Sequence, residues 1–205
     1  MMFVLKSLVT ICLAILGAVP IYSQQCHPLL PDTQQIPLSE CRIIANGKGG
    51  YWNKDNTISA GISFYLLGKP GDVVHTPNAG IRINKDSLTM KIGYYAPGKI
   101  MPTSVQLDLK SFSTTPSKYK ENHKLTIYLD GKPLLSKDAS AISSIVIAEI
   151  FSLEIEYADF LKFTEAKQIT IQLGETKIKL KSEDIEALNE LNKTTKELKP
   201  PLCWI

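Results

Sequence analysis

The sequence predicts a mainly β domain, either a β-sandwich or a curved antiparallel sheet, with one short helix and a C-terminal helix packed on it. About eight to ten short segments with alternating apolar residues follow one another at a spacing of about 8–12 residues, as in many all-β domains. Two-residue turn signals, Asp130-Gly131 and Gly174-Glu175, separate segments that can pair as hairpins. The helical patterns gather near the C-terminal end.

Residues 1–23 have the pattern of a signal peptide. Lys6 supplies a positive charge, an apolar run from Ser7 to Val19 follows, and Pro20 ends it. The run is too short to span a bilayer, and polar sequence follows at once, which favours cleavage before Gln24 over an uncleaved anchor. We therefore expect a secreted or periplasmic protein, with no transmembrane span in the mature chain.

The mature chain is expected to hold a lead-in and one domain. Residues 24–40 are rich in Pro and Gln and form the lead-in, and residues 41–205 form a single β-rich domain. Removal of residues 1–23 leaves 205 − 23 = 182 residues, enough for a substantial core. The mature charge is 22 − 20 = +2. A nearly neutral chain argues against nucleic acid as a partner.

Three cysteines, Cys26, Cys41 and Cys203, remain in the mature chain. In an oxidising compartment this number favours one disulfide and one further thiol. Cys26 with Cys41 closes the shortest loop, whereas a bridge to Cys203 would fasten the C-terminal tail to the body. No metal site is expected, because the sequence has no Cys-x-x-Cys or paired-His spacing.

Apolar alternation predicts the strands between residues 41 and 157. The clearest examples lie at 57–67, 88–94 and 105–109, and a short strand at 81–83 is expected to pair with 88–94 across a turn. Residues 68–80 hold two Pro and three Gly and predict a long loop. Residues 111–122 predict a polar loop, and residues 143–157 predict one long strand or two.

The two turn signals predict two hairpins near the C-terminal end. Asp130-Gly131 favours a type I′ turn that places Ile127 opposite Leu134, and Pro133 favours an edge position for the second arm. Gly174-Glu175 favours a type II′ turn with Ile171 opposite Ile178. Each register puts apolar residues on one face of its hairpin.

Two helices are expected in the same region. Residues 157–166 predict a short helix with Tyr157, Phe160 and Leu161 turned inward. A closing helix is expected from an N-cap at Ser182, and Pro200-Pro201 ends it. The apolar stripe of that helix consists of Ile185, Leu188, Leu191 and Leu198.

The run from Ala166 to Gly174, with the Ile-x-Ile-Gln-Leu-Gly pattern and the leucine-rich segment from Leu180 to Leu191, resembles the end of an uncharacterised domain found in secreted bacterial proteins. The Asp130-Gly131 hairpin upstream is similar too. The resemblance covers about the last half of the chain and rests on structural motifs. It implies a secreted, mostly β domain and brings no catalytic residue with it.

No group of residues has the spacing of a catalytic site. His75 and His123 lie in expected loops, far in sequence from any paired nucleophile. Glu149 is a carboxylate among apolar neighbours, so burial would raise its pKa as in a general acid, although contact with water is the more common outcome. The sequence therefore predicts no catalytic residue and no cofactor.

Three aromatic residues are candidates for ligand binding. Tyr51 and Trp52 follow Gly49-Gly50, and flat rings beside glycine can stack on sugars or anchor a protein partner. A core position at the start of a strand is the alternative for Trp52. Tyr94 and Tyr95 are consecutive in an expected strand, so one of them must face outward, and Tyr95 is the candidate.

These observations favour a secreted or periplasmic, non-enzymatic β-domain that binds a protein or glycan partner at the cell surface. An export signal without a catalytic set is the reason. The alternatives are a secreted hydrolase whose site lies in the loops, through His75, His123 or Glu149, and a structural subunit that assembles through Cys203 or an edge strand.

We expect the exported protein to begin at Gln24 and to carry one disulfide between two of Cys26, Cys41 and Cys203, with Cys26–Cys41 favoured. Closing a loop of about 15 residues would stabilise the fold by about 3 kcal/mol. Intact mass and non-reducing peptide mapping of exported material check both points. Retention of Lys6 would indicate an anchor, and three free thiols would contradict an oxidising compartment.

Overall fold

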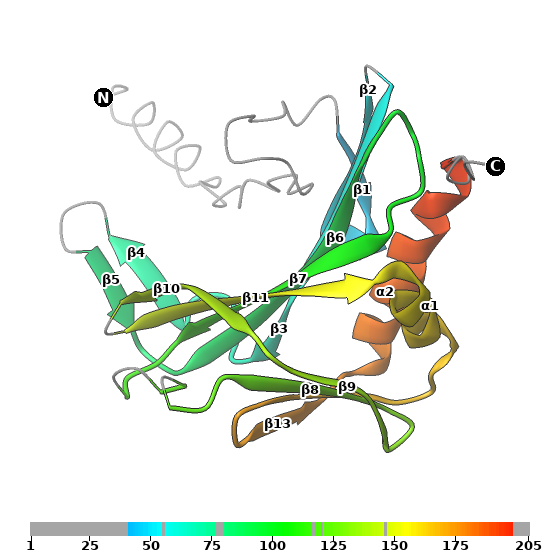
Figure 1. Ribbon diagram of the computed structural model, residues 1–205. Coiled ribbons are helices and arrows are strands. Elements are labelled where there is room, and N and C mark those ends of the chain that lie inside the picture. Colours follow the sequence, from blue (N-terminus) through cyan, green and yellow to red (C-terminus); the bar gives the residue numbers. More distant parts are fainter. Residues whose placement is uncertain are drawn as a thin grey trace, which may run out of the picture.

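The computed structural model describes residues 41–54, 56–76, 80–115, 118–119, 121–145 and 147–198, which form a mainly β structure of antiparallel sheets (Figure 1). The largest sheet has seven strands in the order β1-β2-β3-β6-β7-β11-β10. Their bounds are β1 Cys41–Ile44, β2 Gly49–Lys54, β3 Thr57–Leu67, β6 Ser87–Pro97, β7 Ser104–Phe112, β10 Ser140–Ile145 and β11 Ala148–Glu156.

A four-stranded sheet, ordered β13-β12-β8-β9, packs at one end of the large sheet, and a separate hairpin is formed by β4 and β5. The strands are β8 Lys124–Leu129, β9 Lys132–Asp138, β12 Ile169–Leu173, β13 Thr176–Lys179, β4 Val73–Thr76 and β5 Gly80–Ile83. Buried residues of both sheets and both α-helices belong to one continuous core. The fold class expected from the sequence is therefore confirmed.

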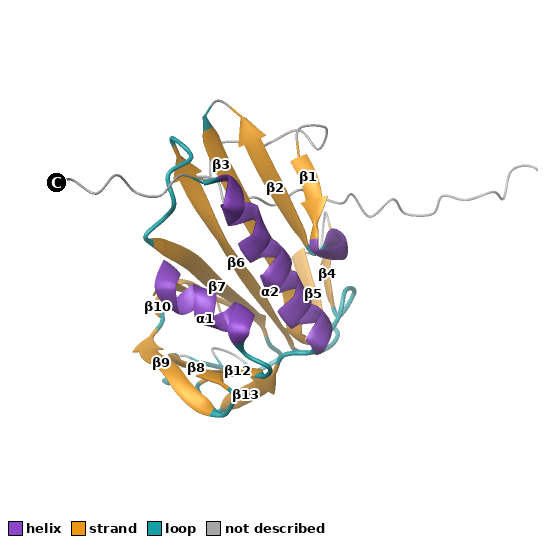
Figure 2. Ribbon diagram, turned by 90° about the vertical axis from the view of Figure 1, so that its right-hand side faces the viewer, coloured by secondary structure: helices purple, strands orange, loops and turns teal. Residues whose placement is uncertain are grey.

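The helices α1 (Tyr157–Glu165) and α2 (Ser182–Thr194) lie on the same face of the large sheet (Figure 2). We call the opposite face the open face. Strand alternation shows which residues belong to the open face. Tyr94 contacts α2, so the residues before and after it in β6, Gly93 and Tyr95, must lie on the open face. Cross-strand pairing then extends the open face to Trp52, Ser59, Gly61, Ser63, Lys91, Gly93, Tyr95, Gln106, Asp108, Ser152 and Glu154.

The Asp130-Gly131 hairpin forms with one change of register. Asp130 and Gly131 have φ values of +48° and +81°, as a type I′ turn requires, and β9 is an edge strand, as Pro133 indicated. Ile127, however, pairs with Leu135 and not with Leu134, because a bulge next to Tyr128 inserts one residue. The second hairpin is confirmed, with Ile171 opposite Ile178 and Gly174 at φ +55°.

Both helices occur close to their expected positions, with small differences in their ends and buried faces. In α1 the inward residues are Tyr157, Phe160 and Phe163, whereas Leu161 is half-buried. In α2 the N-cap is Lys181, whose N–H donates to the Asp184 carboxylate at 3.3 Å, so Ser182 is already the first helical residue. Asp184 thus provides the N3 half of a capping box, and Ser182 is not the cap.

The β4–β5 hairpin was not predicted, because residues 68–80 were expected to be a loop. Instead β5 pairs with β4, while β6 pairs with β3 and β7. Asp72 holds the base of this hairpin. Its carboxylate accepts the Lys69 N–H at 2.8 Å and its carbonyl accepts the Asn84 N–H at 2.8 Å. The bond between Asn84 and Asp72 joins residues twelve apart, which local composition does not reveal.

None of the helices in the described residues is long and apolar enough to cross a membrane.

Leu188→Ala should lower the free energy of unfolding by about 2–5 kcal/mol, because Leu188 is 0% exposed between α2 and the large sheet. Chemical denaturation measures the change. Glu186→Ala, an exposed position on the same helix, is the matched control and should stay within about 0.5 kcal/mol of the parent. Equal stability of both variants would mean that α2 does not pack on the sheet.

Candidate functional site

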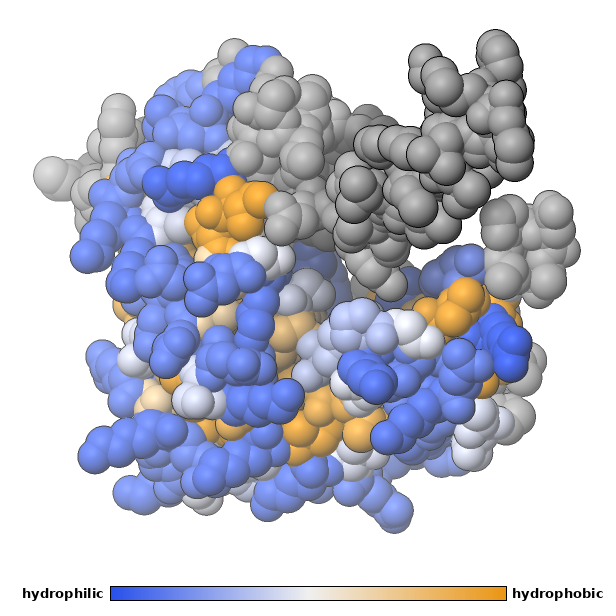
Figure 3. Space-filling model, turned by 180° about the vertical axis from the view of Figure 1, so that it is seen from behind, coloured by the Kyte–Doolittle hydropathy of each residue, from blue (hydrophilic) through white to orange (hydrophobic). Residues whose placement is uncertain are grey.

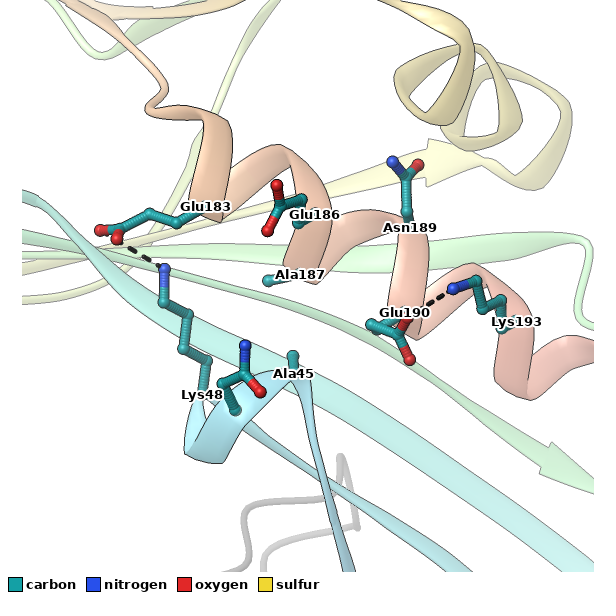
Figure 4. Close-up of a pocket in the computed structure, with 9 residues that line it drawn as sticks. Ala45, Lys48, Glu183, Glu186, Ala187, Asn189, Glu190 and Lys193 are labelled. Atoms are coloured by element: carbon teal, nitrogen blue, oxygen red, sulfur yellow. Dashed lines mark hydrogen bonds and ion pairs between the residues drawn. The ribbon is translucent and has the colours of Figure 1, made fainter.

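A cavity of about 610 Å³ lies between α2 and the β1–β2 turn (Figure 4). It is lined by Ala45, Asn46, Lys48, Glu183, Glu186, Ala187, Asn189, Glu190 and Lys193. Most of the charged side chains that line it form ion pairs. Lys48 Nζ lies 2.7 Å from Asp184 and 3.7 Å from Glu183, and Lys193 pairs with Glu190 at 2.5 Å.

The position of Lys48 follows from an unusual backbone. Ala45, Asn46 and Gly47 adopt φ values of +53°, +52° and +86°, and Ala45 is buried. Left-handed conformations at non-glycine residues cost free energy and persist only where surrounding contacts impose them. Here the contacts are those of Lys48 with the first turn of α2. The cavity walls thus serve to attach the β1–β2 turn to the helix.

The described residues contain no group of three or more His, Cys, Asp or Glu side chains arranged to hold a metal ion. The three glutamates of this cavity therefore do not converge on a common point.

Tyr51, a candidate for ligand binding, lies on the helix side of the sheet. Its hydroxyl donates a hydrogen bond to Glu197, which also accepts from Asn53 at 3.1 Å, and the Arg42 guanidinium lies 4.4 Å from the centre of its ring. Burial and the bond to Glu197 raise the pKa of Tyr51 to about 12. Tyr51 is thus part of the attachment of the C-terminal end of α2, and its ring is buried.

Two further tyrosines attach the same end of α2. Tyr94 shares a hydrogen bond of 2.8 Å with Thr194, and Tyr157 donates to Thr195 at 2.9 Å. Burial raises the pKa of Tyr94 above its ordinary value. The three hydroxyls come from β2, β6 and the start of α1, so this cluster connects distant parts of the chain.

The other two aromatic candidates lie together on the open face. Trp52 pairs with Ser59, and Ser59 pairs with Tyr95, so the three form one row across β2, β3 and β6. Tyr95 is 42% exposed, which leaves its ring accessible to a ligand. Trp52 is only 9% exposed, lies outside the main core cluster, and its indole Nε1 has no hydrogen-bond partner.

The open face contains a polar cavity of about 400 Å³, to which Gly93 contributes, two residues before Tyr95 in β6. We call it the open-face cavity, and its lining consists of Gly93, Tyr94, Ser104, Gln106, Ser152 and Glu154. A second cavity of about 580 Å³ shares Ser104 and Glu154 with it and continues to Lys137 and Glu156. The two cavities therefore adjoin on the open face.

The polar side chains of the open-face cavity hold one another in place. Gln106 Nε2 donates to Asp108 at 3.0 Å and to Ser152 at 3.2 Å, and the Ser152 hydroxyl donates to Asp108 at 2.7 Å. Ser104 donates to Glu154. Groups fixed in this way can bind a hydroxyl-rich ligand without a large loss of side-chain entropy.

These cavity residues were not predicted from the sequence. In β7 and β11 they alternate with the buried Val105, Leu107, Leu153 and Ile155. This alternation in the sequence indicated that the cavity residues lie on the polar face of each strand. It did not indicate that β7 and β11 are neighbours, with Gln106 opposite Glu154 and Asp108 opposite Ser152. That pairing creates the cavity.

The residues of the hydrolase alternative have other contacts. The His75 ring packs edge-on against the Phe112 ring, with 6.0 Å between the ring centres. The His123 ring stacks on the Phe151 ring, with 6.2 Å between the ring centres. Both oxygens of the buried Glu149 carboxylate accept the backbone N–H of Tyr119, each at 3.2 Å. In the described contacts each of the three side chains therefore holds a ring or a loop in place.

Cys26 and Cys203 lie outside the described residues, as do the proposed signal peptide and lead-in, and Cys41 is described only as the first residue of β1. The disulfide therefore stays a prediction.

Comparison of the chain with protein-family models, with curated proteins and with solved structures gave no match. The residues of the open face are thus the basis for a functional proposal.

We expect alkaline pH to destabilise the protein through Tyr51. Its folded pKa of about 12 exceeds the ordinary value of 10.0, so the stabilisation is complete below pH 10 and is lost as the pH rises towards 12. Tyr51→Phe should be less stable than the parent at pH 8, and the difference should shrink between pH 10 and 12. Tyr65→Phe, which alters an exposed tyrosine, is the control. A difference that is independent of pH would contradict the assignment.

Proposed function

We propose that this protein is a secreted or periplasmic, non-enzymatic β-domain that binds a glycan at the cell surface through its open face. The single observation that carries the proposal is the open-face cavity, whose Gly93 lies two residues before the exposed Tyr95 in β6 and on the same face. A flat aromatic ring next to fixed polar groups is the combination that sugars require, because a sugar has an apolar C–H face and a rim of hydroxyls.

The polarity of the open face supports a glycan over a protein partner. Protein interfaces have a central cluster of buried aromatic or aliphatic anchors. Tyr95 is exposed, and the cavity lining contains one aromatic residue, Tyr94, besides glycine, serine, glutamine and glutamate. Figure 3 shows the molecule from behind and not the open face itself; on that side the hydrophobic side chains of the described residues form separate areas within a hydrophilic surface.

The charges near the cavity support a neutral glycan. Asp108 accepts hydrogen bonds from Gln106 and Ser152, and Glu154 accepts from Ser104, so these carboxylates already have partners. An anionic sugar would meet two carboxylates that are engaged with neutral donors, and desolvating them would cost free energy. Neutral hydroxyls can donate to the carboxylates and to the side-chain carbonyl oxygen of Gln106, whose two amide hydrogens are engaged by Asp108 and Ser152.

Export is the part of the proposal that rests on residues 1–23. Their composition is that of a cleaved signal peptide, and cell-surface glycans occur where an exported domain would meet them.

Tyr95→Ala should weaken binding of a neutral polysaccharide by at least about tenfold, the equivalent of about 1.4 kcal/mol, because stacking on the ring is lost. Affinity electrophoresis and calorimetry against glucans, mannans and chitin oligosaccharides measure the change. Tyr65→Ala removes another exposed tyrosine of the large sheet, 38% exposed on β3, and should bind like the parent.

Equal losses in the two variants, or no binding to any glycan, would contradict the proposal. Steady turnover of a glycan or ester substrate that Glu149→Gln or His123→Ala abolishes would favour the hydrolase alternative.

A further inference from the structure

Trp52 is buried on a face of the sheet where its neighbours in the structure are mostly small residues. It lies on the open face, opposite Cys41 of β1 and Ser59 of β3, with Gly50 two residues before it and the exposed Lys54 two residues after it. An indole ring that stands on a sheet among such residues would expose much of its surface to water. Trp52 is nevertheless only 9% exposed, and Ser59 is 0% exposed. A further group must therefore lie over this end of the open face.

The described helices and the β4–β5 hairpin lie elsewhere. Both α1 and α2 are on the opposite side of the large sheet (Figure 2). The β4–β5 hairpin contacts the open face at its other end, where His75 packs on Phe112, which pairs with Ser87 of β6. Tyr95, in the row of Trp52, comes eight residues after Ser87 in the same strand, about 26 Å away.

The connection between β6 and β7 turns to the helix side of the sheet. Its Met101 packs against the hydrophobic core, and the Thr103 carbonyl accepts the Tyr157 N–H at 2.8 Å, at the start of α1. None of these described segments therefore accounts for the burial of Trp52.

The indole nitrogen of Trp52 gives independent evidence of a missing neighbour. Its Nε1–H donor is buried and has no hydrogen-bond partner in the described contacts. Native structures rarely leave a buried donor unsatisfied, because its lost contact with water is then uncompensated. The missing neighbour must therefore cover an apolar ring and also supply an acceptor, and an apolar stretch of polypeptide with a backbone carbonyl does both.

The lead-in, residues 24–40, reaches this place by chain connectivity alone. It lies outside the described residues and ends at Cys41, which pairs directly with Trp52. The apolar triplet Ile36-Pro37-Leu38 is centred four residues before Cys41. Four residues of extended chain span about 12 Å at about 3.1 Å each, which is between two and three strand spacings. The triplet can therefore reach the row that Trp52 forms with Ser59 and Tyr95.

We propose that the lead-in crosses the open face from β1 towards β6, with Ile36-Pro37-Leu38 on the ring of Trp52 and a backbone carbonyl accepting the Nε1–H. Segments that contain proline suit this role, because they adopt extended conformations with unpaired carbonyls and dock on aromatic rings. The inference is independent of the proposed function. The exposed Gln106 and Glu154 of the open-face cavity lie on strands beyond β6, outside the proposed path.

Tryptophan fluorescence of the full exported protein tests the proposal. The sequence has two tryptophans, so Trp204→Phe leaves Trp52 as the sole reporter. In this parent, Trp52 should emit at short wavelength, resist quenching by acrylamide and exchange its indole hydrogen slowly. Adding Ile36→Ser and Leu38→Ser should shift the emission to longer wavelength and increase quenching several-fold. The matched control is Leu29→Ser with Leu30→Ser, which changes two apolar residues of the same lead-in further from β1 and should leave Trp52 protected.

Three results would overturn the inference. They are a Trp52 that is accessible already in the parent, a Trp52 that stays protected in the Ile36→Ser, Leu38→Ser variant, and equal effects of the two pairs of substitutions. The parent measurement needs no lead-in variant, and circular dichroism and thermal unfolding establish that each variant is folded.

Two further measurements separate other occupants of the same surface. Protection that is lost on dilution, together with a larger mass by light scattering at high concentration, would assign the cover to a second copy of the chain. Protection that develops only when neutral oligosaccharides are added would assign it to the ligand. Either result would overturn the role of the lead-in, and the first would leave the proposed function unaffected.

Discussion

The apolar face of the seven-stranded sheet must be removed from water, and the rest of the structure depends on how α1 and α2 cover it. A lone helix as short as α2 is marginal in water, so α2 depends on the sheet as much as the sheet depends on it. Leu188 and Leu191 are fully buried in this contact, and Phe160 and Phe163 of α1 complete the cover. The hydrophobic effect thereby selects one face of the sheet as the inside.

Directional bonds then determine where α2 ends. Hydroxyls of Tyr51, Tyr94 and Tyr157 bind Glu197, Thr194 and Thr195, while Lys48 binds Asp184 at the opposite end. Each tyrosine buries an apolar ring in the core and satisfies its hydroxyl at the rim, so the same residue contributes packing and position. The notable consequence is that Tyr51 is used for attachment and is separated by the sheet from Tyr95.

Two carboxylates control the path of the chain between the sheets. Burial alone would raise the pKa of Asp86, but hydrogen bonds from Thr114 and Ser113 outweigh it and lower that pKa. Glu149 accepts the Tyr119 N–H within the same connection between β7 and β8. The buried glutamate that could have been a general acid thus anchors a loop.

Local patterns in the sequence determined the elements, and the tertiary structure determined which of them meet. Strand alternation, the Asp130-Gly131 and Gly174-Glu175 turns and the stripe of α2 were predictable because they depend on residues only a few positions apart. The bulge beside Tyr128 and the β4–β5 hairpin were not, since contacts distant in sequence decide them.

The same division applies to the candidate site. Alternation showed that Tyr95 or Tyr94 must face outward, but it could not show which face α2 would cover. The open-face cavity arises only when β6, β7 and β11 lie side by side, because Gly93, Gln106 and Glu154 come from separate segments. Cross-strand register, a tertiary property, brings them into one line.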